Sequence, residues 1–474
     1  MATRNDSPAA HLKRALGVWD LTCLCVVAIA NLNIVPVIAA GGPLTVWLWI
    51  VALLFFFLPQ GIAVIELAYQ TPAEGGLYIW TKDAFGDFHG FLCGWCYWTT
   101  NMFFIPTLLF YLAGIATYAG GPALGTLAEN RIFFFSLTVG LLWLAAWANI
   151  RGLGVGKWIS NAGGVGTVLA ASVLILLGIF TVATSGSATP AKSFRVTGFD
   201  LGIFATFGII CFGLVGLELG PVMGDEIREP RRTVPRGTLL GGAISGFLYI
   251  AATLALILAV PQDKMKVLQG VLQGVDAMAT PRGWDWIIPP LAVLIAASII
   301  GSTSAWLSGS ARILFVSGID RYLPKIFGRI HRVHGTPHAA LIAIAVISSL
   351  LVSMSFIGST VKEAYVTLLD LSVVLQMISY LYLFGSLART AFSTGQRQRF
   401  YRPAVVRFAA ISGLVATAVG MAVAFVPTHQ IDSIWRFELK MVSTCLVFLG
   451  VGMGLFRFYS KRRSSEAQFV EAVK

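Results

Sequence analysis

Long apolar runs separated by short polar segments cover nearly the whole chain. A helix crosses about 30 Å of hydrocarbon with roughly 20 apolar residues, and each run is about that long. No soluble-looking block separates the runs, so the pattern predicts one integral membrane domain that is entirely α-helical. The twelve predicted spans are residues 17–40, 44–67, 88–118, 131–150, 155–183, 199–223, 237–260, 284–316, 337–357, 361–387, 404–427 and 434–457.

Two of these spans contain residues that disturb a membrane helix. In the first, Asn31, Asn33 and Pro36 fall at mid-depth, where a freed backbone group has no water to bind. In the sixth, residues 208–221 hold four glycines, a proline and the carboxylate of Glu218. We therefore predict that both helices break. Breaks five spans apart indicate an inverted repeat of five plus five helices, and paired breaks point to a substrate site near the midplane.

Broken helix ends offer binding groups of both signs. Exposed amide N–H groups can receive a carboxylate, and exposed carbonyls can receive an ammonium group. A pair of breaks is therefore typical of a site for a zwitterion or an amine. Other glycines need no such role, because the pairs Gly237/Gly241 and Gly242/Gly246 in the seventh span have the spacing used for close packing of membrane helices.

The composition agrees with lipid as the main solvent. Hydrophobic residues make up 57% of the chain and charged residues only 12%, which excludes an ordinary water-soluble domain. The formal charge of +12 does not indicate nucleic-acid binding, because the basic residues lie between the spans and form no basic face. Most of the 34 Lys and Arg residues flank one set of span ends. This bias predicts a multi-pass protein of the plasma (inner) membrane with both termini in the cytoplasm.

The spans also predict how the chain is divided. Five spans in each half form the repeat, and the last two lie outside it, where they are expected to support packing or the contacts of a homodimer. The predicted parts are a cytoplasmic N-terminal segment at 1–16, a core at 17–387 with halves 17–183 and 199–387, two additional helices at 388–457, and a basic cytoplasmic tail at 458–474.

Cysteine and histidine give no sign of a metal or a cofactor. All six cysteines lie in apolar spans, and Cys93 and Cys96, one turn apart, have no second ligand pair. His331, His334 and His338 share a polar loop with arginines, which favours a solvated loop over a metal site. We expect no cofactor, no metal and no catalytic residue.

Three polar segments next to the spans have a recurring form. They are Glu66-Leu67 followed by Pro72, Gly75-Gly76 and Tyr78; Glu226 followed by Pro230-Arg231 and Pro235-Arg236; and Ser310-Ala311-Arg312 followed by Asp320-Arg321, Pro324 and Thr336-Pro337. In this order they resemble the amino acid/polyamine/organocation (APC) superfamily of secondary transporters. Residues 90–118 are also similar to the glutamate/γ-aminobutyrate exchanger branch of that superfamily.

The resemblance implies where a substrate binds. It places the substrate carboxylate on the first break and the amine on carbonyls of the sixth span, with Phe212 as a gating aromatic and Glu218 in gating or proton linkage. Asp370 in the tenth span is a further candidate for gating or proton linkage, because a carboxylate at that depth is costly without a partner or a cavity. The predicted substrate-binding residues are Ala30, Asn31, Leu32, Asn33, Ile34, Asn101, Cys211, Phe212, Gly213, Leu214, Val215 and Gly216.

Two features depart from the superfamily pattern. Most relatives have small residues where this chain has Asn31-Leu32-Asn33, so we expect the carboxylate to meet side-chain amides as well as backbone, and the substrate need not be a standard α-amino acid. Some proton-coupled relatives carry a lysine midway along the fifth span. Here Lys157 lies near the cytoplasmic end of that span, which argues against proton symport through such a lysine.

We therefore expect a secondary active transporter for an amino acid or related amine, working by alternating access as an exchanger or a proton-coupled symporter. In this hypothesis spans 1, 2, 6 and 7 rock against spans 3, 4, 5, 8, 9 and 10. The alternatives are a polyamine or organocation permease and a membrane-embedded sensor that binds without transport. An embedded enzyme would need clustered His, Asp or Glu near one leaflet, a pattern that the sequence lacks.

Overall fold

The described part of the chain folds almost entirely into membrane-length helices. The computed structural model describes residues 16–72, 75–195, 201–262, 265, 270–357, 360–393, 398–426 and 434–472. Within them, ten helical segments are long and apolar enough to cross a membrane. Residues 1–15 of the predicted N-terminal segment lie outside the described residues, as do 473 and 474 of the predicted tail. The ten segments are Thr45–Gln70 (α3, the π-helix η2 and α4), α6 Asp87–Ala119, α8 Arg131–Ile150, α9 Leu153–Ser185, α12 Pro230–Ala259, α14 Ile288–Ile319, α15 His338–Ser355, α16 Val361–Phe392, α17 Pro403–Val423 and α18 Ile434–Ala472.

Two further crossings are made by broken helices, as predicted. The first consists of α1 Val18–Ile29 and α2 Ile34–Ala39, and the second of α10 Leu201–Gly213 and α11 Leu219–Val222. Pro36 has no N–H to continue the hydrogen-bond ladder of the first span. In the second, Gly216 has a φ of +134°, which only glycine adopts without strain. The prediction of an all-α membrane fold with twelve crossings and breaks in the first and sixth is confirmed.

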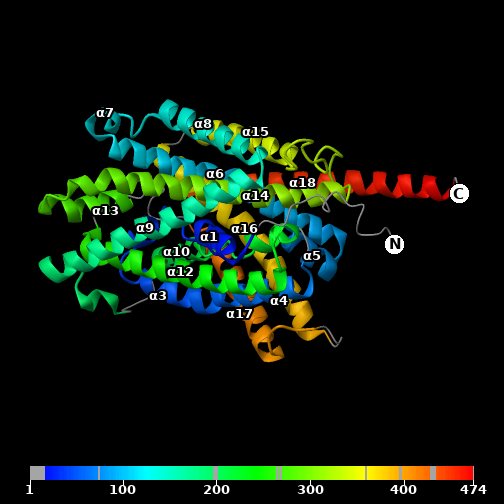
Figure 1. Ribbon diagram of the computed structural model, residues 1–474, viewed down its shortest axis with the longest axis horizontal. Helices are drawn as coiled ribbons and strands as arrows, with labels where there is room; N and C mark the ends of the chain where they lie inside the picture. Colours follow the sequence, from blue (N-terminus) through cyan, green and yellow to red (C-terminus); the bar gives the residue numbers. More distant parts are fainter. Residues whose placement is uncertain are drawn as a thin grey trace.

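The broken spans lie in the middle of the bundle. Figure 1 shows α1 and α10 at its centre, with α8 and α15 together on one flank and α17 on the opposite flank. Helices α6 and α16 are the most deeply buried of the long spans, and α18 is the most exposed. The centre is therefore lined by helices that are shielded from lipid.

Glycines allow the closest approaches between helices. A Cβ on Gly163 of α9 would lie 2.6 Å from the Cα of Gly301 on α14, and a Cβ on Gly241 of α12 would lie 2.4 Å from the Cβ of Cys25 on α1. The packing role predicted for Gly237 and Gly241 is thus confirmed, because both face α1. Gly242, by contrast, has only ordinary contacts at 3.5 Å to Leu217 and Phe57.

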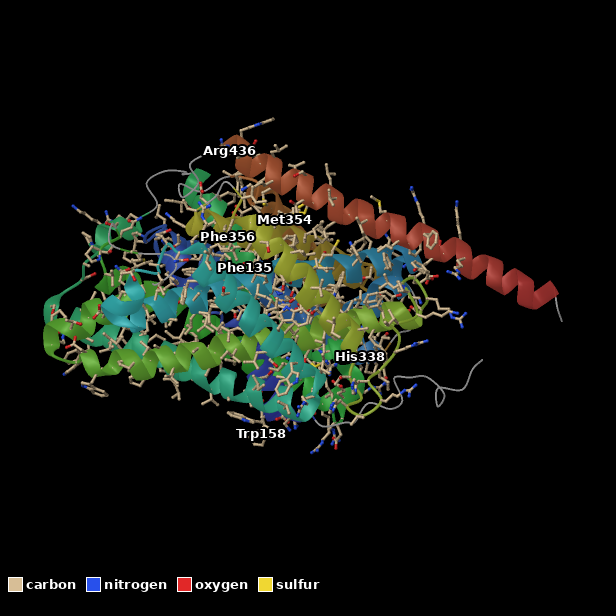
Figure 2. All side chains as sticks on the ribbon, turned by 90° about the horizontal axis from the view of Figure 1, so that it is seen from above. Phe135, Trp158, His338, Met354, Phe356 and Arg436 are labelled. Atoms are coloured by element: carbon tan, nitrogen blue, oxygen red, sulfur yellow. The ribbon has the colours of Figure 1, made fainter. Side chains whose placement is uncertain are left out.

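The outer surface is apolar and carries exposed tryptophans near the helix ends. Trp158 near the start of α9 is 74% exposed and points away from the body in Figure 2. Trp435 at the start of α18 is 72% exposed. Tryptophans in these places are typical of the boundary between hydrocarbon and head groups. Helix α18 also continues past the end predicted at residue 457 and projects beyond the body (Figure 2), because residues 458–472 contain no glycine or proline to stop it.

The three polar motif segments of the sequence meet at one end of the bundle. We call this the basic end: α4, α14 and α16 end there, and α1 and α12 begin there. The Gly75 N–H donates to the Val222 carbonyl at 2.9 Å, and a Cβ on Gly76 would lie 3.1 Å from the backbone of Pro221. The Tyr78 hydroxyl donates to Asp320 at 2.6 Å. The first segment therefore fastens the loop after α4 to the sixth span and to the end of α14.

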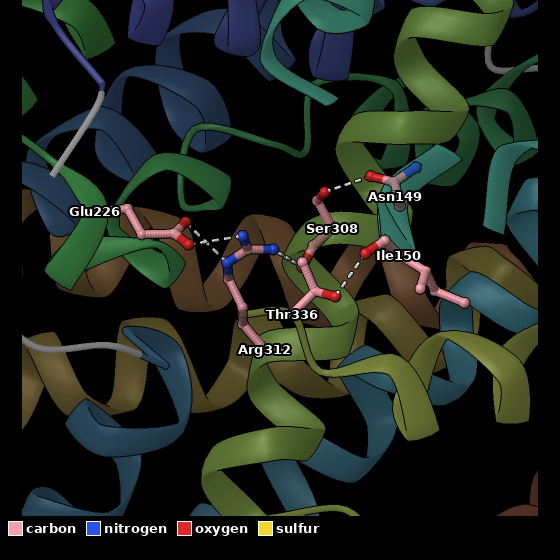
Figure 3. Close-up of polar contacts among 6 residues, drawn as sticks. All are labelled: Asn149, Ile150, Glu226, Ser308, Arg312 and Thr336. Carbon is pink, nitrogen blue, oxygen red and sulfur yellow. Dashed lines mark hydrogen bonds and ion pairs between the residues drawn. The ribbon is translucent and has the colours of Figure 1, made fainter. Parts of the chain in front are cut away.

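A buried ion pair joins the other two segments. The Arg312 guanidinium donates to both Glu226 carboxylate oxygens, at 2.8 and 2.9 Å, and to the Ser308 carbonyl at 2.7 Å (Figure 3). Both side chains of the pair are 5% exposed or less. Nearby, the Ser308 hydroxyl donates to Asn149 at 2.6 Å. The pair is thus satisfied in a fork geometry that lysine could not reproduce.

We predict that Glu226→Gln destabilises the protein strongly, because it leaves the Arg312 charge buried without a counter-ion. The expected loss in free energy of unfolding is about 3–5 kcal/mol, measured as a fall in the thermal unfolding midpoint in detergent. The thermal unfolding midpoint of the double variant Glu226→Leu with Arg312→Met is expected to lie closer to that of wild type than the midpoint of Glu226→Leu or of Arg312→Met alone. Additive losses in that cycle would contradict the assignment of a coupled buried pair.

Candidate functional site

One hydroxyl joins the two helix breaks. The Tyr249 hydroxyl, on α12, accepts from the Asn31 N–H at 3.0 Å and lies within hydrogen-bond distance of two carbonyls, Ile29 in the first break and Gly213 in the second. A hydroxyl has one proton to donate, so the two carbonyls share it. The Tyr249 ring stacks on Trp49 of α3 with centroids 4.5 Å apart. This stacking holds the hydroxyl where both breaks can use it.

The breaks also pack directly on each other. A Cβ on Gly213 would lie 3.2 Å from the Ile34 side chain, and a Cβ on Gly216 would lie 3.0 Å from the Ile29 side chain. The freed backbone of both spans therefore converges on one region, as the predicted site requires.

Several backbone groups in this region remain without a partner. Among the described residues, no hydrogen bond is made by the N–H groups of Leu32 and Asn33, nor accepted by the carbonyls of Ala30, Leu214 and Val215. An unpaired backbone group costs free energy in an apolar environment. These donors and acceptors are therefore the groups that a polar ligand would satisfy.

The Asn31 side chain closes the end of α1 and links it to α14. Its amide nitrogen donates to the Ala28 carbonyl at 2.7 Å, and its oxygen accepts from the Ser302 hydroxyl at 2.7 Å. The Trp306 indole donates to the same Ala28 carbonyl at 3.1 Å. Both the amide nitrogen and the amide oxygen of Asn31 are thus bonded to protein groups.

Asn33 and Asn101 each keep an open acceptor. Asn33 donates to the Tyr365 hydroxyl on α16 at 3.3 Å, and its carbonyl oxygen has no partner within the described structure. Asn101 donates to the Tyr97 carbonyl of its own helix at 2.9 Å, and its oxygen is likewise unpaired there. Both are at most 1% exposed. The structure places Asn33 at the first break, whereas Asn101 makes no hydrogen bond to the described residues of either break.

Phe212 belongs to an aromatic cluster between the breaks and α6. Its ring meets Phe104 edge to face with centroids 5.0 Å apart, and Phe104 meets Trp306 in the same way at 5.6 Å. Tyr97 lies 6.0 Å from Trp306. Aromatic pairs of this geometry pack firmly. Phe212 therefore links the end of α10 to α6 through its contact with Phe104.

Glu218 is the centre of a fully buried hydrogen-bond network. One carboxylate oxygen accepts from the Gly216 N–H at 3.1 Å, from Gln60 of α4 at 3.1 Å and from the Tyr380 hydroxyl of α16. Tyr97 of α6 also faces this carboxylate. The other oxygen accepts no hydrogen bond from the described residues. Glu218 therefore connects the sixth span to three neighbouring helices.

The buried charges of the bundle are mostly acidic. Among the described side chains, the buried charged groups are Glu66, Glu218, Glu226, Asp370 and Arg312. Glu226 pairs with Arg312, and Glu66 accepts from the N–H groups of Phe400 and Tyr401 at 3.0 and 2.9 Å. Asp370, the tenth residue of α16 and 4% exposed, and Glu218 have no basic partner among the described residues.

The remaining predicted residues fall around the breaks, with one exception. Ala30, Leu32, Leu214 and Val215 lie in the unwound segments. The Cys211 side chain instead faces α17, where a Cβ on Gly420 would lie 3.5 Å from its sulfur. Its sulfur therefore belongs to helix packing, although its backbone lies in the last turn before the break.

The structure brings together no metal site within the part of the chain that it describes. There, no three side chains of His, Cys, Asp or Glu are grouped as metal ligands. Cys93 and Cys96 are buried thiols on α6. His331 and His334 stack with centroids 4.7 Å apart in the loop before α15.

Sequence reasoning missed the residues that satisfy the breaks from other helices. Tyr249, Gln60 and Tyr380 come from the seventh, second and tenth spans, far from the breaks in sequence. The sequence does show each of them as a polar side chain inside an apolar run. Such a side chain is costly in a membrane unless it has a partner, which indicates that a partner exists. The sequence does not reveal which partner that is.

Comparisons with known proteins agree with this geometry. The family model described as amino acid permease matches residues 16–451. An uncharacterized transporter of Legionella pneumophila is 28% identical over 452 residues, covering 93% of this chain and 96% of the relative. A probable agmatine/putrescine antiporter of Lactococcus lactis is 26% identical over 374 residues, covering 77% of this chain and 76% of the relative. An uncharacterized transporter of Mycobacterium tuberculosis is 25% identical over 358 residues, covering 74% and 76%.

Removing the Tyr249 hydroxyl should loosen both breaks at once. We expect Tyr249→Phe to lower the free energy of unfolding by about 1–3 kcal/mol, because the Gly213 carbonyl loses the partner it has among the described residues, and the Asn31 N–H and the Ile29 carbonyl each lose one of theirs. Thermal unfolding of the purified protein measures the loss. Thr253→Val on the same helix is the matched control, since the Thr253 hydroxyl has no partner within the described structure. Equal stability of Tyr249→Phe and Thr253→Val would show that the hydroxyl does not hold the breaks.

Proposed function

The chain belongs to the amino acid permease family, and from this premise we propose that it is a secondary active transporter that exchanges a small amine-bearing solute by alternating access. Membership of the family makes the protein a multi-pass membrane transporter and not an enzyme. The solute class and the mode of coupling are our proposal.

The observation that carries the proposal is the convergence of two helix breaks on one hydroxyl. Tyr249 contacts both breaks, and the unpaired N–H groups of Leu32 and Asn33 lie in the same region as the unpaired carbonyls of Leu214 and Val215. The N–H groups suit a carboxylate and the carbonyls suit an ammonium group. An amino acid or a related amine satisfies these groups better than an uncharged solute.

The charge balance favours a solute with a net positive charge. Glu218 and Asp370 are buried, and no basic side chain of the described structure is paired with them. A cationic substrate supplies the missing positive charge, whereas an acidic one adds repulsion. The similarity to a probable agmatine/putrescine antiporter supports an amine cargo and exchange as the mode of transport.

Alternating access requires contacts that can open between two groups of spans. We propose that spans 1, 2, 6 and 7 move against spans 3, 4, 5, 8, 9 and 10. Near the breaks, several polar and aromatic contacts cross this boundary and would have to open. They include Asn31 with Ser302, Asn33 with Tyr365, Glu218 with Tyr380 and Phe212 with Phe104. Phe212 closes the site by packing on Phe104, and Glu218 links closure to its own protonation.

We also propose the location and orientation of the protein. The basic end collects the arginines of the second and third motif segments, which the positive-inside rule places in the cytoplasm. Both termini then face the cytoplasm at the plasma membrane.

The transport proposal is tested in liposomes that contain the purified protein. We expect labelled agmatine, putrescine or arginine to accumulate when the liposomes hold the same unlabelled amine, and glutamate to accumulate much less. Uptake that needs internal amine indicates exchange, and uptake driven by a pH gradient alone indicates symport. Saturable binding of an amine without any uptake would favour the sensor and overturn the transporter.

Glu218→Gln should flatten the pH dependence of exchange. Glutamine keeps the hydrogen bonds to oxygen but cannot change its protonation, so we expect the rate to vary by less than about twofold between pH 5 and 8. The control is Glu129→Gln, which neutralises a carboxylate in the exposed loop before α8. This variant should keep the wild-type pH dependence of the exchange rate. A wild-type profile in Glu218→Gln would remove this residue from proton linkage.

A further inference from the structure

An apolar groove runs along the outside of the moving group of spans. It lies between α12 on one side and η2 with α4 on the other, and has a volume of about 620 Å³. Leu54 and Leu58 line it from the second span, and Leu239 and Phe247 line it from α12. These four side chains are 50% to 66% exposed. The groove is therefore open to the surrounding lipid, and its volume is that of a ligand site.

The dimensions of the groove suit one hydrocarbon chain. Along α12 its lining extends from Thr238 to Leu254, which at 1.5 Å per residue is about 24 Å. One leaflet of hydrocarbon is about 15 Å thick, so an acyl chain fits along the helix without reaching the far end.

Backbone features create the space. Residues Leu53–Phe57 form a π-helix at the groove wall, and such segments occur often at functional sites. Opposite it, Gly242 and Gly246 have no side chains, and a Cβ on Gly246 would lie 3.2 Å from Leu53. The two glycines therefore let η2 approach α12 closely, and they place no side chain on this part of the groove surface.

The end of the groove nearest the basic end is polar. Thr238 is 2% exposed and lines the groove, and its hydroxyl has no partner among the described residues. Tyr401 lines the same groove, and Arg402 follows it as the residue that caps α17. Arg236 is exposed and lies three residues before Leu239 and seven before Ala243. This spacing puts it on the same face of α12 as these two groove-lining residues.

We propose that this groove binds one acyl chain of an anionic phospholipid. The chain lies against the leucines, the Thr238 hydroxyl donates to an ester carbonyl, and Arg236 and Arg402 contact the phosphate. Basic residues at the membrane surface next to an apolar groove are the chemistry that selects an anionic head group. A hydrocarbon with no ester would leave Thr238 unsatisfied, and a zwitterionic head group would gain less from the two arginines.

A bound chain would touch the substrate site through one residue. Leu217 lines the groove and is the neighbour of Glu218 in the break of the sixth span. The lipid site therefore borders the segment that has to move, and its occupancy acts on that segment directly.

The experiment uses the intact purified protein and phosphatidylglycerol that carries a photoreactive group on one acyl chain. We expect cross-links to the peptide covering residues 238–254 and retention of phosphatidylglycerol over phosphatidylcholine in native mass spectrometry. Ala243→Phe fills the groove from an exposed position on α12 and should reduce cross-linking by about tenfold, the effect of excluding about two buried methylene groups. Ala162→Phe, at an exposed position on α9 outside the groove, is the matched control.

The head-group part is tested separately. Arg236→Gln with Arg402→Gln should abolish the preference for phosphatidylglycerol, and Thr238→Val should weaken retention of both lipids without changing the fold. Unchanged thermal unfolding midpoints show that each variant is intact. Equal cross-linking in Ala243→Phe and Ala162→Phe would overturn the site, and an unchanged lipid preference in the double arginine variant would overturn the anionic assignment. Neither result depends on which solute the protein transports.

Discussion

The need to satisfy freed backbone groups inside a membrane is the constraint on which this structure depends. A continuous helix pairs its own N–H and C=O groups, and a broken one must find partners elsewhere. Here Tyr249 serves both breaks, Asn31 and Trp306 close the end of α1, and Glu218 accepts the Gly216 N–H. The groups that remain unpaired define the place where a polar solute can bind.

The bundle combines firm and loose contacts in a way that suits movement. At the basic end, the Glu226–Arg312 pair (Figure 3) and the Tyr78–Asp320 bond tie loops to helix ends. Around the breaks, contacts across the moving boundary include the Asn31–Ser302 hydrogen bond and the Phe212–Phe104 aromatic pair. The motif segments therefore set the geometry of the loops, whereas the site itself is held by interactions that can be exchanged for contacts with a solute.

Much of the fold follows from the sequence because membrane helices are governed by local rules. Apolar length predicts the spans, and Pro36 and Gly216 mark the breaks through the missing N–H and the positive φ. For the candidate site, the sequence could indicate only residues within the two breaks themselves, such as Leu32, Asn33 and Val215. Tyr249, Gln60 and Tyr380 reach the breaks from other spans. Which side of an apolar helix faces the centre of the bundle depends on how the helices pack, and the residues near each position in the sequence do not reveal this. For the same reason the side chain of Cys211, next to Phe212, points to α17.

The most direct test of the central claim is amide hydrogen exchange of the reconstituted protein with and without a transported amine. Binding at the paired breaks predicts slower exchange in the peptides covering residues 29–34 and 213–218 together, because the same solute occupies both. Slower exchange at only one of them, or protection confined to other spans, would contradict a site formed by the two breaks.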